Sequence, residues 1–323
     1  MLSSSYASVD TGLTGLSTNA RGALILTLTM AGFQFNNSLM KLAGAQGVGV
    51  FEAVLVRDTV VVVGLTIIAA VRGELRPMGR RDFAMVSLRA SVETVAVFSF
   101  LTALFHMQQA NAVAILNALP IVVIAGAAVA FGESVGPRTW AVVFLGFVGV
   151  LIVLRPSSDG FEAPALLALA ATIFGAARDL LAKHVVDKAL PATLLALASA
   201  LLVCVVAGST LLLLGEWRPL KPLELSYLVL AGLCMSVSYL GNVVALRLGD
   251  SSFVQPFGFS RLLWATFFGF FFFGEVPDLV SLAGAAIVVG CGLYVILDER
   301  HRAAPEPTQT SMMRKVASGR QLY

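Results

Sequence analysis

Ten long apolar runs constrain the fold of this chain more than any other feature of its sequence. The hydrocarbon core of a bilayer is about 30 Å thick, and an α-helix needs about 20 residues to cross it. Each run is close to that length and is bounded by turn signals or charges. The expected helices lie at about residues 23–42, 50–71, 83–104, 110–131, 138–154, 163–184, 192–214, 225–246, 253–273 and 278–297.

The composition supports a membrane location for these runs. The 323 residues are 58% hydrophobic and only 13% charged, whereas soluble domains are about 25% charged. The mean hydropathy of +0.87 agrees with this. A membrane β-barrel would show alternating segments of about ten residues, and the sequence has none. We therefore predict an all-α integral membrane protein with ten transmembrane helices.

Loop charges indicate the orientation of the helices. If both termini are cytoplasmic, most of the 22 Lys and Arg residues fall at inner helix ends, in inner loops or in the tails. Basic residues favour the cytoplasmic side, so we expect N- and C-termini inside. Residues 1–22 and 300–323 are polar and are predicted to be disordered tails. The outer helix ends would carry Lys41, Arg155, Arg218 and Lys221.

Two stretches of the chain resemble each other. They are "NALPIVVIAGAAVAFGESVGPRTWAVVFLGFVGVLIVLRP" at 117–156 and "PFGFSRLLWATFFGFFFFGEVPDLVSLAGAAIVVGCGLYVIL" at 256–297. Each has an apolar helix that ends in Gly-Glu, a short turn and a Gly-rich helix. The two halves, 23–154 and 163–297, then hold five helices each, and an odd number inverts the second half in the membrane. The alternative is a chance likeness between apolar helices.

The two Gly-Glu pairs mark helix ends. Glycine tolerates the positive φ of a helix C-cap, so Gly132 and Gly274 should end their helices. Glu133 and Glu275 then belong to the turns, either as solvated interfacial residues or as parts of a gate. Asp278 is expected to cap the last helix.

In this arrangement the chain resembles the EamA-type drug/metabolite transporters, in particular a bacterial ten-helix member. The resemblance covers about residues 22 to 298 and rests on the order and spacing of several motifs. It implies a bacterial inner-membrane protein with a substrate path between two halves, worked by alternating access. Family members carry amino acids, nucleotide-like metabolites, vitamins and toxic compounds, and span nine is most similar to S-adenosylmethionine and riboflavin carriers. The motifs are "VLVRDTV", "NALPIVV", "WAVVFLGFVGVLIVLRP", "FGAARDLLAKHV" and "SRLLWATFFGFFFFGEVPD".

Charges within the spans are candidates for a functional cluster, because each costs at least about 2.5–3.5 kcal/mol to insert. From the helix rise, Arg57 lies roughly 20 Å and Glu93 roughly 15 Å from the inner surface. Arg57 and Asp58 are neighbours and should not face each other, whereas Arg89 and Glu93 share a helix face. We predict a cluster centred on Arg57 and Glu93. It is either a packing clamp or a substrate or coupling site, with Asp58 and Glu93 as candidate proton carriers.

Arg261 lies deep in span nine without an acidic residue nearby in the sequence. Pro256 can break the helix before it. Trp264 follows one turn later, and a guanidinium beside an indole suits an anionic or aromatic group. Arg261 and Trp264 are therefore candidate substrate-binding residues, and a structural pair between Arg261 and a distant acid is the alternative.

Other polar residues at mid-membrane depth are further candidates. Gln34 and Asn37 are three apart in span one and share a face, which we expect to point inward. Asn117 in span four and Tyr239 in span eight are weaker candidates for substrate binding. Polar groups at this depth either bond between helices or line a wet path, and both roles stay open.

The residue pattern favours a secondary transporter over other classes. The three His and three Cys residues are dispersed, and no Gly-rich phosphate loop is present, so we expect no enzyme activity, metal site or cofactor. The expected partners are a small-molecule substrate and membrane lipid, with possible proton coupling, no nucleic acid, and a monomer or homodimer. A membrane receptor or scaffold is the alternative, and a membrane enzyme is a more distant one.

Overall fold

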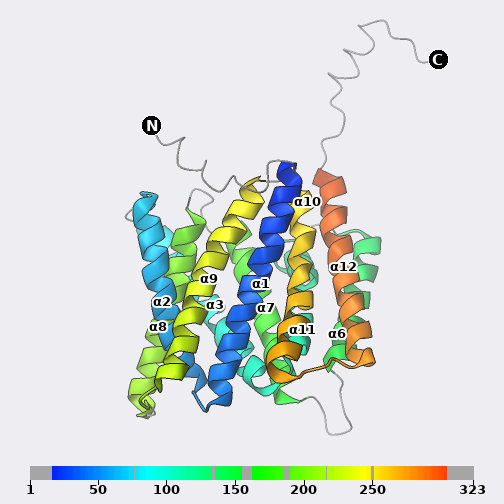
Figure 1. Cartoon of the computed structure of the whole chain (residues 1–323). Helices are drawn as coiled ribbons and strands as arrows, with labels where there is room; N and C mark the ends of the chain where they lie inside the picture. The colour runs from blue at the N-terminus through cyan, green and yellow to red at the C-terminus, as the bar shows by residue number, and fades with distance from the viewer. Residues whose placement is uncertain are drawn as a thin grey trace, which may run out of the picture.

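The computed structural model describes residues 17–75, 78–132, 135–154, 162–184, 190–215, 217–248 and 251–303. The regular elements in these ranges are all helices, and most run up and down through one bundle (Figure 1). They are α1 (Thr18–Ala45), α2 (Val50–Val71), α3 (Arg80–His106), α4 (Gln109–Leu116), α5 (Leu119–Phe131), α6 (Pro137–Leu154), α7 (Ala163–His184), α8 (Ala192–Leu214), α9 (Pro222–Leu248), α10 (Ser251–Val254), the 3₁₀ helix η1 (Gln255–Phe259), α11 (Ser260–Phe273) and α12 (Leu279–Ala303).

These elements form the ten predicted spans. In the described part of the chain, 7 helices are long and apolar enough to cross a membrane, counting α4–α5 as one and η1–α11 as another. Helices α6 and α12 contain shorter apolar segments. Helix α1 is 28 residues long and carries the polar residues predicted for span one. The first and last helices extend beyond the predicted spans, because α1 begins at Thr18 and α12 continues to Ala303.

The outer surface of the bundle is apolar. Val129, Leu212 and Leu213 are 81%, 86% and 86% exposed, and many other large hydrophobic side chains share this position. Exposed apolar area on this scale is foreign to a soluble monomer. An apolar outer surface is what a membrane-spanning bundle requires, and the predicted all-α membrane fold is confirmed.

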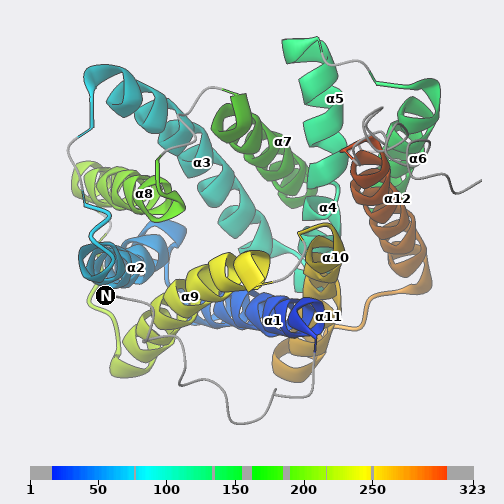
Figure 2. The same ribbon diagram turned by 90° about the horizontal axis from the view of Figure 1, so that it is seen from above.

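The packing of the helices shows the inverted repeat directly. Contacts run mainly between the first half, α1–α6, and the second, α7–α12. The two halves correspond helix by helix, so that α1 matches α7, α3 matches α9 and α5 matches α11. The contact between α1 and α9 then matches that between α7 and α3, and the contact between α1 and α11 matches that between α7 and α5. The pairs α2–α8 and α6–α12 map onto themselves and lie at opposite ends of the bundle (Figure 2). The two halves therefore share one interior.

The fourth and ninth spans are both interrupted in their first half. Helix α4 ends at Leu116 with Asn117 as its C-cap, and α5 begins with Pro120 in its first turn. In the ninth span, η1 carries Pro256 in its first turn and precedes α11. Helix α10 ends at Val254, just before Pro256, so the predicted break is confirmed. Its physical reason is that proline cannot donate a backbone hydrogen bond. Broken helices expose backbone polar groups at mid-membrane depth, where transporters bind their substrates.

The predicted ends of both broken spans are also confirmed. The C-caps of α5 and α11 are Gly132 and Gly274, with φ of 67° and 65°. Asp278 caps α12 by accepting a hydrogen bond from Val280 N at 3.2 Å. Glu133 lies outside the described residues, whereas Glu275 is placed and contributes to the site described below.

Helices α6 and α12 touch through two glycines. A Cβ atom on Gly284 would come within 2.8 Å of the Gly149 carbonyl oxygen, and one on Gly149 within 3.0 Å of the Gly284 carbonyl oxygen. Small residues allow this close approach of backbones, and packing is a main source of helix association in lipid.

Replacing Gly284 by Ala is expected to lower the melting temperature of the purified protein, because backbone atoms of α6 would have to move. Gly290→Ala is a matched control on the same helix, where a Cβ meets nothing within 4 Å. It should leave the melting temperature unchanged or raise it, since Ala favours helix. Equal melting temperatures for the two variants would contradict the glycine contact.

Candidate functional site

A cavity of about 380 Å³ lies at the interface of the two halves. Every broken span and five unbroken ones contribute to its walls, which combine amides, aromatic rings and charges. The residues that give it this character are Phe33, Gln34, Asn36, Asn37, Arg57, Glu93, Phe100, Arg178, Tyr239, Asn242 and Arg261. We call it the central cavity.

A second cavity of about 330 Å³ adjoins the first, and we call it the vestibule. It shares Glu93, Arg178, Tyr239 and Asn242 with the central cavity. It reaches Arg72 at the end of α2, on the face of the bundle where α1 begins and α12 ends (Figure 1). We call this the terminal face. The two cavities together lead from the terminal face to the middle of the bundle.

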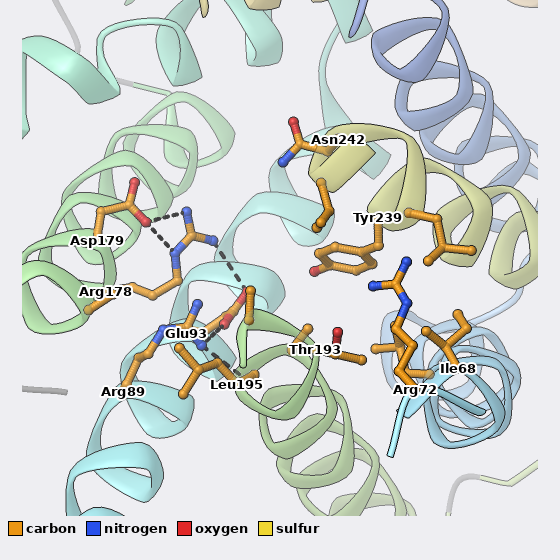
Figure 3. Close-up of a pocket in the computed structure, with 16 residues that line it drawn as sticks. Ile68, Arg72, Arg89, Glu93, Arg178, Asp179, Thr193, Leu195, Tyr239 and Asn242 are labelled. Atoms are coloured by element: carbon orange, nitrogen blue, oxygen red, sulfur yellow. Dashed lines mark hydrogen bonds and ion pairs between the residues drawn. The ribbon is translucent and has the colours of Figure 1, made fainter. Parts of the chain in front are cut away.

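Glu93 joins three helices at the meeting point of the two cavities. Its carboxylate accepts hydrogen bonds from Arg89 Nη1 at 2.9 Å, Ser199 Oγ at 2.6 Å and Arg178 Nη1 at 3.3 Å. Figure 3 shows Arg178 lying between Glu93 and Asp179, and its Nε donates to Asp179 at 2.9 Å. This cluster ties α3 to α7 and α8. The predicted shared face of Arg89 and Glu93 is confirmed.

The predicted pairing of Arg57 with Glu93 is wrong. Arg57 instead turns back to its neighbour, and its Nε donates to Asp58 Oδ2 at 3.1 Å. Adjacent helix positions point about 100° apart, but the Arg side chain is long enough to bridge them. Both residues are buried. Their ion pair matters because an unpaired buried charge is strongly destabilising. The place expected for Arg57 beside Glu93 is taken by Arg178.

Arg261 differs from the other arginines of the membrane interior. Its side chain lines the central cavity, and its Nε donates to the side-chain amide oxygen Oδ1 of Asn117. No carboxylate of the described chain lies within ion-pair distance of it. Five arginines and two carboxylates line the two cavities, and Asp58 balances one of the arginines. The walls therefore carry net positive charge, and Arg261 is one of its sources.

The amides of α1 line the central cavity, as the sequence predicts for Gln34 and Asn37. Asn37 Nδ2 donates to Gln34 Oε1 at 3.1 Å. Gln109, the first residue of α4, donates to the Gln34 backbone carbonyl at 3.0 Å and accepts from Ser38 Oγ at 2.8 Å. These bonds hold the polar face of α1 in place while leaving amide groups on the cavity wall.

Lys41, near the end of α1, and Glu275, just after α11, line a separate pocket away from the terminal face. They form an ion pair, and Lys41 Nζ also donates to the Met107 carbonyl at 2.6 Å. Glu275 accepts a hydrogen bond from Gln109 N at 2.9 Å, where the positive end of a helix favours a carboxylate. Their side chains are 12% and 13% exposed. We call Lys41, Gln109 and Glu275 the closing cluster.

The structure separates the two aromatic candidates. Tyr239 lines both cavities and packs edge-on against Phe33, with ring centroids 5.8 Å apart. Trp264 is absent from the walls of the described cavities and stacks on Phe268 at 6.0 Å. Asn117 is not on the wall either, because its buried side chain stands behind Arg261.

Sequence reasoning missed several residues of the site. Phe33 and Phe100 line the cavity but have no distinguishing local pattern. Arg178 had a signal that was not used, because Arg178–Asp179 repeats the Arg-Asp pair of Arg57–Asp58. Among the described residues, no group of three or more His, Cys, Asp or Glu is placed to hold a metal ion.

Comparison with known proteins places this geometry in context. The model of a family described as the EamA-like transporter family matches residues 20–155 and 163–297. A riboflavin transporter of Vibrio cholerae is 27% identical over 83% of this chain and 90% of its own length. A riboflavin transporter of Rhizobium johnstonii is 31% identical over 59% of this chain, a match that spans 63% of that relative.

Two further similarities were found. An S-adenosylmethionine uptake transporter of Rickettsia prowazekii is 26% identical over 71% of this chain and 71% of its own length. A solved crystal structure superposes with a TM-score of 0.56 at 17% identity, over 88% of this chain and 99% of the other. The latter likeness concerns the fold alone.

The Glu93 cluster predicts a specific stability effect. Glu93→Gln leaves Arg89 and Arg178 without their shared carboxylate, and breaking a buried pair destabilises by about 3–5 kcal/mol. We expect a clear drop in the melting temperature of the purified protein. Asp179→Asn is the control, because the Asp179 side chain is 39% exposed and Arg178 keeps Glu93 as a partner. A larger drop for Asp179→Asn would show that Glu93 is not the centre of the cluster.

Proposed function

The chain belongs to the EamA-like transporter family, and from this we propose that it carries a riboflavin-like metabolite across a bacterial inner membrane through the central cavity. The substrate class is an uncharged heteroaromatic compound with several carbonyl oxygens and hydroxyl groups. One observation carries this proposal: a net positive cavity in which Arg261 has no carboxylate partner among the described residues.

Riboflavin fits the chemistry of the cavity wall. Its flat ring system carries two carbonyl oxygens, which can accept hydrogen bonds from a guanidinium. Phe33 and Tyr239 offer aromatic surface to the ring, and the amides of Gln34 and Asn37 offer partners for the hydroxylated side chain. Pockets for ligands of this size have volumes of about 300–1,000 Å³, a range that includes the central cavity.

S-adenosylmethionine is the second candidate, because relatives bearing that name also resemble the chain. It carries a sulfonium cation and an ammonium group against a single carboxylate, so its net charge is positive. A cavity with surplus arginines disfavours such a ligand, since like charges brought together in a low dielectric repel strongly. The charge of the cavity therefore favours riboflavin.

The arrangement of open and closed sides suggests the transport cycle. With the termini in the cytoplasm, as the loop charges predict, the vestibule opens inward and the closing cluster shuts the outer side. Alternating access then requires Lys41 and Glu275 to separate when the substrate path opens outward. The inverted repeat supports this exchange, because its two halves offer equivalent backbone arrangements on the two sides.

Proton coupling stays a prediction for Asp58 and Glu93. A gradient acts on a titratable group that water can reach, and Glu93 borders both cavities, whereas Asp58 is buried against Arg57. We therefore place the candidate coupling role on Glu93. Counterflow in liposomes with and without a pH gradient measures it directly.

Riboflavin binding is the first test. A ligand that binds the folded state raises its melting temperature by mass action. We expect riboflavin, and not S-adenosylmethionine, to stabilise the purified protein and to exchange in liposome counterflow. Arg261→Gln should abolish both effects, whereas Trp264→Phe should keep them because Trp264 lies off the cavity wall. Stabilisation by S-adenosylmethionine alone would refute the proposal.

The closing cluster is tested by access from outside. In a variant without native cysteines, Asn37→Cys reports on the central cavity through its rate of modification by a membrane-impermeant thiol reagent. Adding Glu275→Gln should accelerate the modification from the side opposite the termini, because Lys41 loses its ion pair. Glu162→Gln is the matched control, because Glu162 lines the same pocket as Lys41 and Glu275. An equal rate in both variants would remove Glu275 from the closing cluster.

A further inference from the structure

Asn117 and Arg261 meet where the two broken spans face each other. Asn117 is the C-cap of α4 in the first half, and Arg261 lies in the first turn of α11 in the second. The Asn117 side chain is fully buried, and its carbonyl oxygen accepts the Nε hydrogen bond of Arg261. The terminal nitrogens of Arg261 have no hydrogen-bond partner in the described chain, and the residue lines the central cavity.

The choice of an amide as partner is unusual at this site. Arg57, Arg89 and Arg178 each have a carboxylate within hydrogen-bond distance. Aspartate has almost the same shape as asparagine, so space does not explain the neutral partner at position 117. A carboxylate there could accept two parallel hydrogen bonds from the guanidinium, which is the stronger arrangement.

The amide also leaves a polar group without a partner. Asn117 Nδ2 is buried and has no hydrogen bond in the described structure. An unsatisfied buried donor costs about 1–3 kcal/mol. An aspartate would remove this donor and balance the nearby charge. The asparagine is thus the less stable choice for the protein alone, which points to a role in binding.

We propose that Asn117 is a positioning residue, which fixes the orientation of Arg261 without neutralising it. The Nε bond aims the guanidinium across the junction of the two halves, and its terminal nitrogens stay available to an acceptor group of the ligand. The identity of that acceptor rests on the function proposed above, whereas the uncompensated state of Arg261 does not. The pair also lies at the meeting point of both broken helices, so ligand binding acts on both halves at once.

The substitution Asn117→Asp separates positioning from a simple structural tie. It should leave the melting temperature of the ligand-free protein unchanged or higher, since an ion pair replaces a hydrogen bond from the guanidinium to a neutral acceptor. Its riboflavin affinity and KM in counterflow should worsen roughly tenfold or more, because a hydrogen bond to a charged group is lost to the ligand. A stabilised variant with wild-type affinity would show that Asn117 is only a tie between helices.

A second variant guards against misfolding of Asn117→Asp. Asn117→Ala keeps Arg261 charged but removes its support. Thr172→Val is the matched control, because buried Thr172 donates to the Ile115 carbonyl at 3.3 Å beside the same break and is not bonded to Arg261. We expect similar losses of melting temperature, but weaker riboflavin binding only for Asn117→Ala. Equal affinity in the two variants overturns the proposal.

A readout without substrate separates this inference from the proposed function. Phenylglyoxal modifies accessible guanidinium groups, and mass spectrometry can follow the reaction at Arg261. Modification should be rapid in the wild type and at least several times slower in Asn117→Asp, where the guanidinium is paired. If the wild type does not bind riboflavin, the proposed function is contradicted but this inference is not. If Arg261 is modified at equal rates in the wild type and in Asn117→Asp, the inference is contradicted but the proposed function is not.

Discussion

The need to balance charge inside an apolar solvent governs this structure. A charged side chain within a bilayer must find a partner or a wet cavity. Arg57 finds Asp58 on its own helix, and Glu93 gathers Arg89 and Arg178 from two helices. These bonds fix how α3, α7 and α8 lie against one another, because α7 cannot turn without exposing a cation to hydrocarbon. Arg261 stands apart, since its partner among the described residues is an amide. This exception is the observation behind the proposal that Arg261 donates hydrogen bonds to acceptor groups of a ligand.

The inverted repeat explains where that exception lies. Each helix packs mainly on helices of the opposite half, so the interface between halves is also the interior of the protein. The two broken spans meet at this interface, where Asn117 and Arg261 give it polarity. The helix contacts are symmetric between the halves, but the side chains are not: Lys41 and Glu275 form an ion pair on one side, and the vestibule lies on the other. A symmetric frame with an asymmetric set of bonds is what alternation between two states requires.

The sequence predicts the frame better than the site. Span length, glycine ends and the break at Pro256 follow from local physics, and the shared face of Arg89 and Glu93 follows from helix period. The partner of Arg57 and the direction of Trp264 do not. In a soluble protein the apolar stripe of a helix points to the core, whereas lipid is as apolar as the core and the stripe gives no direction. Helix period shows that Gln34 and Asn37 share a face, but not that Gln109 lies opposite them. Long arginine side chains add a further choice among several acids at similar depth.

Substrate choice in this family cannot be read from overall similarity, because relatives named for riboflavin and for S-adenosylmethionine resemble the chain to nearly the same degree. The fold fixes a cavity between two halves and leaves its contents open. What differs between an uncharged flavin and a sulfonium cation is charge, and charge is the quantity that the buried site controls most strongly. Three of the interior arginines are paired with carboxylates and therefore serve the bundle. Arg261 has no carboxylate partner among the described residues, and in the proposal above selectivity depends on the amide of Asn117 remaining neutral.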